Sequence, residues 1–258
     1  RPAHRAGRAG RPEGVTVELV QFHFDPRCPW CFQASRWIRR LEELGEIRPS
    51  WSLYCLELAN LKEGLDPVTL GTTARSATAL RTAAAIFLAT GSSDGVGAFY
   101  KALGDRVWMT SEPASDRDLA VRESAAEAGF DAELLDKAMA DSATWEEVMR
   151  QHYALAEGRH GIGVPSIVLD GGSGPEIFGP VLSHFPDDED ALAIWEHVRW
   201  LARYDNFYEL KRYRTSQPDI PGWKVPASKL TFGSRPWMPP VPDEHVPADG
   251  VPLRLPKE

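Results

Sequence analysis

The sequence predicts an α/β fold in which an all-helical insertion interrupts a small mixed sheet. Three observations lead to this prediction. Residues 15–58 read as strand, helix and strand, which is a βαβ unit. Between residues 66 and 158 the period of the apolar positions changes from two to about 3.6, as in helices. Short strand patterns then return at residues 166–178, followed by one more amphipathic helix.

Composition narrows the class of protein. The chain has 258 residues and 43% hydrophobic content, enough for one good core, whereas two full domains would be small. A net charge of −8 argues against general nucleic-acid binding and against an anionic membrane surface. No apolar run approaches the roughly eighteen residues that span a bilayer. We therefore expect no nucleic-acid partner and no membrane partner.

The N-terminal region consists of a basic tail and the first strand. Residues 1–14 hold four arginines and one glutamate, without the apolar centre of a signal peptide, so we expect a disordered tail. Val15 to Phe24 carries apolar side chains on both faces, which is typical of a central strand. His23 within this strand is either a packed, hydrogen-bonded histidine or a neighbour that tunes the cysteines that follow.

The next elements complete the βαβ unit. Phe32 to Leu44 is an amphipathic helix that ends at Gly45. Ile47 to Leu58 alternates as a second strand, parallel to the first. Cys55 falls inside this strand pattern, and we expect it to be buried as a packing residue, with a third redox thiol as the alternative.

Cys28-Pro29-Trp30-Cys31 stands between the first strand and the first helix. A strand, a short turn, C-x-x-C and a helix are the arrangement in which two cysteines carry out dithiol–disulfide chemistry. At the helix N-terminus, unpaired N–H groups and the dipole stabilise a thiolate on Cys28, and Pro29 at the first helical position loses no hydrogen bond. Cys31 shares its helical stripe with Ala34, Ile38 and Leu41. We therefore predict an exposed, nucleophilic Cys28 and a buried, resolving Cys31.

Other uses of the cysteines are less consistent with the pattern. A zinc site needs four ligands, and Cys55 has no C-x-x-C partner, so we expect no metal site. A structural disulfide between Cys28 and Cys31 would close a very small loop and restrain little chain entropy. Three cysteines do not make a disulfide framework, so export to an oxidising compartment is not required.

The helical insertion and the C-terminal region follow. Helices are predicted over five stretches, namely Ala74 to Thr90, Val96 to Leu103, Arg117 to Ala128, Ala132 to Ala140 and Ala143 to Glu157. His152 and His160, at the end of this block, are expected on the surface. A hairpin, Ser166 to Asp170 with Glu176 to Phe178, precedes a closing helix that starts at the acidic run Asp187 to Asp190.

The last segment changes character again. Ten of the 21 prolines lie between Pro218 and Pro256, among aromatic residues. Such proline density excludes a helix, so we expect a disordered or extended tail. The aromatics leave open a tail that lies over its own chain or over a partner subunit, and with it a homodimer. The predicted organisation is a basic tail (1–14), an N-terminal sheet part (15–65), a helical insertion (66–160), a C-terminal sheet part (161–215) and a Pro-rich tail (216–258).

Val164-Pro165, just before the third strand, is the predicted second half of the site. An isolated X-Pro bond is usually trans. After a C-x-x-C helix, however, a βαβ unit, a helical crossover, a hairpin and a helix together make the thioredoxin layout. In that layout a cis-proline faces the two sulfurs, excludes metal ions and leaves a backbone edge for an extended substrate. We therefore expect Val164 and Pro165 to contact the substrate.

The chain resembles the DsbA-like thioredoxin-fold oxidoreductases, and within them the mycothiol-dependent reductases of actinobacteria. The matching segments are Asp25-Pro26-Arg27-Cys28-Pro29-Trp30-Cys31-Phe32, Ser35-Arg36-Trp37-Ile38, Gly163-Val164-Pro165, Phe178-Gly179-Pro180-Val181-Leu182-Ser183 and Phe207-Tyr208-Glu209-Leu210-Lys211-Arg212. The resemblance implies a cytoplasmic thioredoxin fold with an inserted helical subdomain. It also implies a nucleophilic first cysteine, a resolving second cysteine and recycling by reduced mycothiol.

The resemblance implies two further pocket residues. The tryptophan of C-P-W-C and an asparagine just after the second strand line the family's pocket, and they match Trp30 and Asn60. Asn60 is equally consistent with a strand-end turn. A pocket tyrosine of the family has no counterpart between Leu61 and Thr73.

The predicted function is a thiol–disulfide oxidoreductase, a reductase recycled by a small thiol that acts on an oxidised small molecule or a protein disulfide. No tightly bound cofactor is expected. An exported thiol oxidase would need a signal sequence, which is not visible. A kappa-class glutathione transferase or hydroxychromene-carboxylate isomerase would share the fold but has no need of Cys31. A binding adaptor would use the Pro-rich tail and could dispense with both cysteines.

Overall fold

A computed structural model describes residues 17–111, 116–212, 214 and 216–223 of the chain. The chain divides into two compact units. The fold described below belongs to the first, which holds the described residues 17–209 and 216–223. Of the second unit only residues 210–212 and 214 are described, and these form no helix or strand. The predicted basic tail at 1–14 lies outside the described residues.

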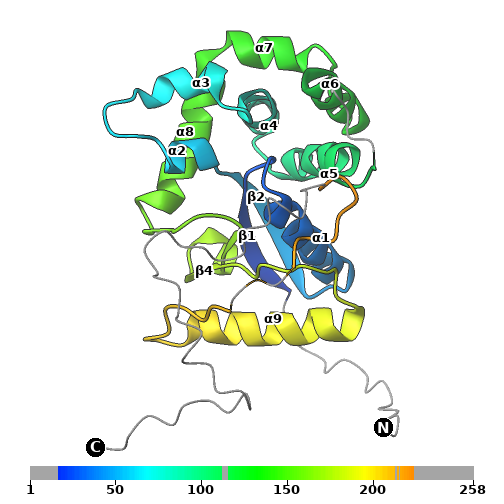
Figure 1. The fold of residues 1–258 in the computed structure, drawn as a ribbon, viewed down its shortest axis with the longest axis vertical. Coiled ribbons are helices and arrows are strands. Elements are labelled where there is room, and N and C mark those ends of the chain that lie inside the picture. Colours follow the sequence, from blue (N-terminus) through cyan, green and yellow to red (C-terminus); the bar gives the residue numbers. More distant parts are fainter. Residues whose placement is uncertain (1–16, 112–115, 213, 215, 224–258) are drawn as a thin grey trace, which may run out of the picture. The chain divides into compact units, whose positions relative to one another are not determined.

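A mixed sheet is the centre of the first unit (Figure 1). Its strands, in the order β2-β1-β3-β4, are β1 (Glu18–Phe24), β2 (Ile47–Leu53), β3 (Ser166–Val168) and β4 (Glu176–Phe178). β1 is parallel to β2 and antiparallel to β3, and β4 is antiparallel to β3. A parallel pair needs a crossover, which is α1 (Pro29–Glu43). A βαβ unit followed by a hairpin and a helix is the thioredoxin fold that the sequence predicts.

Helices α1 and α9 (Asp188–Arg203) pack against each other. Trp37 of α1 is fully buried and donates a hydrogen bond from Nε1 to the backbone oxygen of Ala191 (3.1 Å). Its ring meets Trp195 edge to face. The acidic run starts α9 as predicted, because the Asp187 carboxylate accepts a hydrogen bond from the Asp190 N–H as the N-cap. Carboxylates in the first turn also complement the helix dipole.

Helices fill the chain between β2 and β3 (Figure 1). They are α2 (Leu56–Ala59), α3 (Leu70–Thr73), α4 (Ala77–Thr90), α5 (Asp94–Trp108), α6 (Arg117–Glu127), α7 (Leu134–Ala140) and α8 (Ser142–Ala156), with a 3-10 turn η1 (Pro67–Thr69) before α3. A second 3-10 turn, η2 (Asp170–Gly172), connects β3 to β4. Buried Arg81 fastens α4 to its neighbours by donating to Thr144 Oγ1 (2.9 Å) and to the backbone oxygens of Gly71 (3.0 Å) and Asp141 (2.9 Å).

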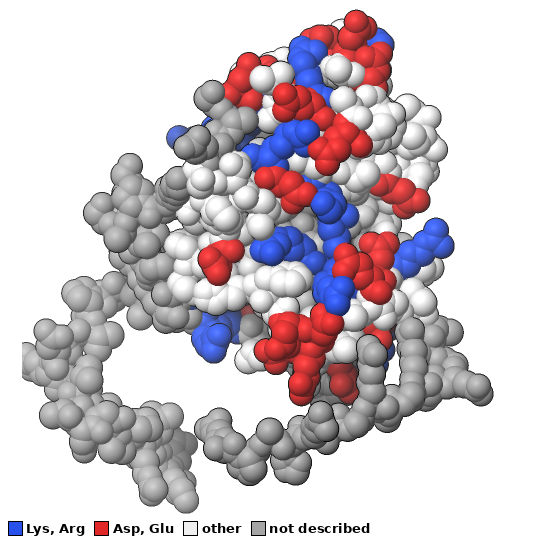
Figure 2. All heavy atoms as spheres, turned by 90° about the vertical axis from the view of Figure 1, so that its right-hand side faces the viewer, with Lys and Arg blue, Asp and Glu red and all other residues white. Residues whose placement is uncertain are grey.

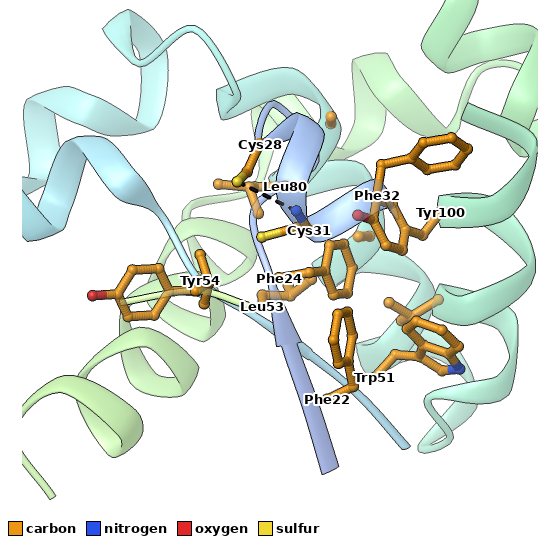
Figure 3. Packing of buried hydrophobic residues seen from close by; sticks show 14 of the residues in the cluster. Phe22, Phe24, Cys28, Cys31, Phe32, Trp51, Leu53, Tyr54, Leu80 and Tyr100 are labelled. Carbon is orange, nitrogen blue, oxygen red and sulfur yellow. Dashed lines mark hydrogen bonds between the residues drawn. The ribbon is translucent and has the colours of Figure 1, made fainter. Parts of the chain in front are cut away.

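One hydrophobic core joins the sheet to this helical block. At its centre, Phe24 of β1 stacks on Tyr100 of α5 with ring centroids 3.8 Å apart. Phe22 and Trp51, paired across β1 and β2, meet edge to face beside them. Figure 3 shows Phe24 and Phe22 below the two cysteines of the C-x-x-C motif, with Trp51 and Tyr100 to the side of these rings. The core therefore supports the floor of the predicted site.

Two predicted boundaries differ most from the structure, both for tertiary reasons. The second strand ends at Leu53 rather than at Leu58, because the chain turns into α2, and Cys55 becomes the N-cap residue of this helix. The helix predicted over Val96 to Leu103 extends over Asp94–Trp108. Gly97 and Gly104, two of its three glycines, lower helix propensity in sequence but lie where α5 packs closely on aromatic rings.

The beginning of the predicted Pro-rich tail is folded. Residues 216–223 are described, and within them Ile220 is buried in the core. Trp223 packs against Trp108 of α5 with ring centroids 5.9 Å apart, and Gly222 N–H donates to the Trp108 backbone oxygen (2.8 Å). For this short segment the structure agrees with the alternative of a tail that lies over its own chain, rather than with a disordered tail, because Trp223 packs on α5 and Ile220 is buried in the core. The rest of the predicted tail lies outside the described residues.

Charged residues of both signs alternate on the surface formed by α1, α5 and α6 (Figure 2). They pair locally, as in Lys101 with Asp105 (2.7 Å) and Arg122 with Asp136 (2.6 Å). This face therefore presents no large patch of one sign. Among the described residues, no helix combines the length and the apolar character that a membrane crossing requires.

Candidate active site

Cys28 and Cys31 lie at the N-terminus of α1. Cys28 is the N-cap residue, Pro29 occupies the first turn, and the Cys31 N–H donates to Cys28 Sγ (3.4 Å; Figure 3). The Cys28 N–H in turn donates to the backbone oxygen of Asp25 (3.0 Å), which fixes the turn before the helix. An extended N-cap residue places its side chain over the free N–H groups of the first turn. The Cys28 sulfur therefore sits where a negative charge is stabilised.

The two thiols have opposite acid–base character. The pKa of Cys28 is lowered, chiefly by a hydrogen bond from the Cys31 thiol, with the backbone N–H of Cys31 adding to it against the cost of burial. The pKa of Cys31 is raised well above its ordinary value, chiefly by burial and then by its interaction with Cys28. Cys28 is 7% exposed and Cys31 is fully buried. The expectation of an exposed Cys28 is corrected to one that is nearly buried, with a small accessible fraction.

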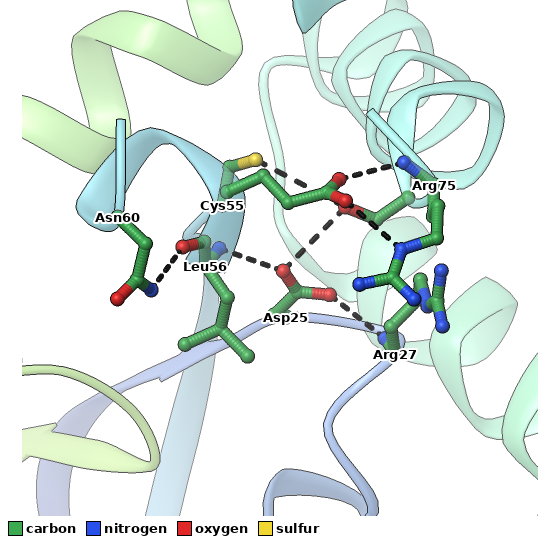
Figure 4. Close-up of polar contacts among 8 residues, drawn as sticks. Asp25, Arg27, Cys55, Leu56, Asn60 and Arg75 are labelled. Carbon is green, nitrogen blue, oxygen red and sulfur yellow. Dashed lines mark hydrogen bonds and ion pairs between the residues drawn. The ribbon is translucent and has the colours of Figure 1, made fainter. Parts of the chain in front are cut away.

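Asp25 is a buried carboxyl group that the sequence reasoning did not place in the site. It is 1% exposed, and Figure 4 shows it between the C-x-x-C turn and α2. Its Oδ1 accepts from the Arg27 N–H (2.8 Å) and its Oδ2 from the Leu56 N–H (2.8 Å). Burial raises the pKa of Asp25 to about 6, against these two hydrogen bonds. Its negative charge also raises the pKa of both Cys28 and Cys31.

The sequence does contain one indication of Asp25. It is a charged residue that stands directly after a buried strand and just before C-x-x-C. The partners that make it a buried acid could not be read from the sequence. Leu56 lies 31 residues away along the chain, and Ser76, whose hydroxyl is 3.5 Å from Oδ2, lies 51 residues away.

Cys55 is buried near Asp25, and the Ser76 hydroxyl lies within reach of both. Its Sγ lies 4.0 Å from Ser76 Oγ, and burial raises its pKa to about 11. A thiol with a raised pKa and no exposed surface is a poor nucleophile. These features favour the packing role over that of a third redox thiol.

Val164 and Pro165 lie at the same end of the sheet as the cysteines. β3 runs antiparallel to β1 with Ser166 opposite His23, so Pro165 comes next to the end of β1, where the C-x-x-C turn begins. The Val164–Pro165 peptide bond is cis, and Val164 is 7% exposed. A second cis bond, Gly179–Pro180, was not predicted. Trp30 is half-buried and packs against the core from the C-x-x-C turn.

Asn60 is the C-cap residue of α2. Its side chain is exposed, and Nδ2 donates to the backbone oxygen of Leu56 (2.6 Å; Figure 4). This contact matches the alternative interpretation of a turn residue, although the turn closes a helix rather than a strand. A pocket role for Asn60 stays a prediction.

The histidines differ from one another. His23 is buried, its Nε2 lies 3.0 Å from Gln21 Oε1, and burial lowers its pKa to about 3, as expected for a packed histidine. The surface placement of His152 is wrong. It is 1% exposed, its ring packs on Tyr54, and its Nδ1 accepts from the Cys55 N–H (3.5 Å). Burial lowers its pKa to about 4. His160 is exposed, as predicted.

Metal-ligating residues do not gather elsewhere in this part of the chain. Across residues 17–111, 116–212, 214 and 216–223, no group of three or more histidine, cysteine or carboxylate side chains could hold a metal ion. Chemically, the site offers a low-pKa thiol, a second thiol in contact with it and a buried acid behind both.

Comparison with known proteins relates the chain to one enzyme family. Residues 27–212 match the family described as mycothiol-dependent nitroreductase Rv2466c. The uncharacterized protein Rv2286c of Mycobacterium tuberculosis is 31% identical over 196 residues, covering 76% of this chain and 82% of that protein.

Solved structures were compared as well. A putative protein disulfide isomerase from Nitrosomonas europaea is 13% identical, covers 73% of this chain and 100% of its own, and superposes with a TM-score of 0.48. A probable DsbA oxidoreductase, SCO1869, from Streptomyces coelicolor is 17% identical, covers 81% of this chain and 99% of its own, and superposes with a TM-score of 0.46.

The family match spans both ends of the site, from the residue before Cys28 to beyond α9, and most of the chain's length. The chain belongs to the family of the mycothiol-dependent nitroreductase Rv2466c.

Proposed function

We propose that the chain is a cytoplasmic thiol–disulfide reductase that uses Cys28 and Cys31 as a dithiol and is recycled by mycothiol. The observation that carries the proposal is the asymmetry of the pair. Cys28 has a lowered pKa and an accessible fraction, whereas Cys31 has a raised pKa and none. A nucleophile should be a thiolate at neutral pH, and a resolving thiol should stay protonated until a mixed disulfide forms.

The reaction with a disulfide substrate has two steps. The Cys28 thiolate attacks one substrate sulfur, a Cys28–substrate disulfide forms, and the other half of the substrate leaves as a thiolate. Cys31 then loses its proton and attacks the Cys28 sulfur, which releases the second half of the substrate. The protein ends with a Cys28–Cys31 disulfide, and the substrate has gained two electrons.

Mycothiol would restore the dithiol by the same chemistry. One mycothiol thiolate attacks the protein disulfide, and a second displaces the protein thiolate, giving oxidised mycothiol and reduced protein. The family's description supports this choice of thiol. Trp30, which is half-buried beside Cys28, is the proposed apolar wall of the substrate site. The backbone of Val164, before Pro165, is the proposed edge to which an extended substrate pairs.

A trapping experiment tests the dithiol mechanism. In Cys31→Ser the first step should proceed and the second should not, so a mixed disulfide should accumulate on Cys28 and be visible in the intact mass. The matched control, Cys55→Ser, should form the intramolecular disulfide as the wild type does. Unchanged turnover by Cys31→Ser would contradict the proposal and favour a transferase-type enzyme with one nucleophile.

The reduction potential tests the direction of electron flow. A reductase should have a potential at or below about −220 mV, whereas about −120 mV is that of a strong oxidant. Equilibration in thiol–disulfide buffers, read as free thiols by mass, gives this value. A potential near the oxidising limit would favour the exported oxidase.

The family's description also makes a nitro compound a candidate substrate. Oxidation of one dithiol to a disulfide yields two electrons and two protons, which is what conversion of a nitro group to a nitroso group and water consumes. Mycothiol-dependent loss of a nitroaromatic absorbance, abolished in Cys28→Ser, is the expected result. Loss that persists in Cys28→Ser would contradict this choice of substrate.

A further inference from the structure

Arg27, directly before Cys28, has only part of its hydrogen-bonding capacity satisfied by the described residues. Its backbone N–H donates to Asp25, but Nη1 of its guanidinium is buried and has no hydrogen-bond partner among the described residues. Burying a cationic donor without a partner costs free energy. Such a group in a folded protein calls for an explanation, which can be an absent ligand.

Two more arginines lie around the same guanidinium. After burial, the positive charges of Arg75 and then Arg117 are the main causes that lower the pKa of Arg27. Figure 4 shows the side chains of Arg27 and Arg75 next to each other. Arg75 precedes α4 and Arg117 opens α6, so positive charges from segments far apart in the chain act on the Arg27 guanidinium.

Acidic residues offset this charge only in part. Glu57 of α2 pairs with Arg75, accepting from its backbone N–H (2.6 Å) and its Nε (3.1 Å). Asp25 adds a buried carboxyl group whose pKa is raised to about 6. The charges that act on the Arg27 guanidinium are thus those of two further arginines and these two carboxyl groups. Like charges that gather at the expense of stability are typical of a binding site for the opposite charge.

We propose that Arg27, Arg75 and Arg117 form a binding subsite for an acidic group, a carboxylate or phosphate, of the oxidised substrate that Cys28 attacks. This inference rests on the proposed function and narrows it to anionic substrates. An arginine guanidinium binds carboxylate and phosphate oxygens with paired hydrogen bonds, and the buried Nη1 of Arg27 has no such partner among the described residues. The bound group holds the substrate disulfide beside the Cys28 sulfur.

Two small aromatic disulfides of different charge test the subsite. Dithiobis(nitrobenzoate) carries two carboxylates, and dithiodipyridine is neutral. Both oxidise the reduced protein with release of a coloured thiol, so stopped-flow absorbance gives the rate constant for each. Arg117→Gln should slow the anionic disulfide by about three-fold, the effect of one screened charge contact, and leave the neutral one unchanged. Arg75→Gln should behave in the same way.

Arg122→Gln is the matched control. Arg122 lies on the same helix as Arg117 but pairs with Asp136 (2.6 Å), so its loss changes the net charge equally without touching the subsite. It should leave both rate constants unchanged. The wild type's preference for the anionic disulfide should also shrink as the salt concentration rises, because the Debye screening length falls to about 3 Å at 1 M salt.

The outcomes separate the subsite from the proposed function. Equal slowing of both disulfides in Arg117→Gln and Arg75→Gln, or no slowing of either, would overturn the anion subsite. Failure of wild-type protein to form the Cys28–Cys31 disulfide with dithiodipyridine would overturn the dithiol mechanism. The preference between the two probes would still test the subsite in that case, because the first attack by Cys28 needs no second thiol.

Discussion

At the scale of single residues, burial shifts the pKa values of several titratable groups in and near the site. Burial raises the pKa of Asp25 to about 6, while it lowers the pKa of His23 to about 3 and that of His152 to about 4. Each shift favours the neutral form of the group, because charge is costly in the core. Asp25 keeps its carboxyl group bonded to two backbone N–H groups, which joins the C-x-x-C turn to α2.

Replacing Asp25 by Asn should change how stability depends on pH. The folded-state pKa is about 6 and the unfolded value 3.8, so this group stabilises the fold fully below about pH 4 and not above about pH 6. The wild type should therefore lose roughly 3 kcal/mol relative to Asp25→Asn as pH rises through that window. Urea unfolding of both reduced proteins at several pH values measures the difference.

Comparing the wild type with Asp25→Asn also removes the contribution of the two buried histidines to the pH dependence of stability. His23 and His152 stabilise the fold above about pH 6.5 and lose that contribution as pH falls toward their lowered pKa values. They are present in both proteins, so their effect cancels in the difference. A difference that does not vary between pH 4 and pH 6 would show that the folded-state pKa of Asp25 is ordinary.

At the scale of elements, α5 is positioned by two glycines on one face. A Cβ on Gly97 would overlap the Trp51 ring, and a Cβ on Gly104 would overlap the Phe32 ring. Seven residues make about two helical turns, so both glycines face the sheet and α1. Their missing side chains let α5 approach the aromatic floor under Cys28 and Cys31, where Tyr100 stacks on Phe24.

Gly104→Ala should destabilise the protein although alanine is the better helix former. Helix propensity alone favours alanine by about 1 kcal/mol. Overpacking against Phe32 costs about 1–3 kcal/mol, since an aromatic ring in the core has little room to move. The difference between these two effects is a net loss of up to about 2 kcal/mol in urea unfolding.

Ala98→Gly supplies the control on the same helix. Ala98 is exposed, so this change reports helix propensity without packing. It should cost about 1 kcal/mol. A gain in stability for Gly104→Ala, mirroring the loss for Ala98→Gly, would mean that Phe32 moves aside without cost.

At the scale of the whole unit, the sheet and the helical insertion share one core. Leu80 of α4 belongs to the same buried cluster as Cys28, Cys31 and Phe24 (Figure 3). α4, α5 and α8 all contact β2. An insertion with this much shared core should not unfold independently of the sheet.

Leu80→Ala should therefore destabilise the site as well as the insertion. The side chain is fully buried, and its truncation should cost about 2–5 kcal/mol. Far-ultraviolet circular dichroism and the reactivity of Cys28 should report the same shifted urea midpoint.

Leu119→Ala on α6, which is half-exposed, should shift that midpoint far less. Two separate transitions for Leu80→Ala, with Cys28 protected through the first, would show that the insertion is an independent folding unit. The predicted boundary between insertion and sheet would then separate two units that unfold independently.

The sequence by itself determined the features that depend on neighbouring residues. These are the C-x-x-C motif at a helix N-terminus, the inward direction of Cys31, the helical periodicity after residue 66 and the hairpin of β3 and β4. A thiol's place on a helix and a strand's alternation follow from local backbone geometry, so periodicity and capping residues predict them.

Only the tertiary structure decided the features that depend on residues far apart in the chain. Examples are the end of β2 at Leu53, the burial of His152 and the enclosure of Asp25. Each depends on contacts between residues far apart in the sequence, such as Asp25 with Leu56 (31 residues apart) and Leu53 with Gln151 (98 residues apart). The effect of the Arg75 and Arg117 charges on Arg27 is of the same kind. The partners that enclose Asp25 and His152 come from distant segments of the chain, and no local pattern identifies them.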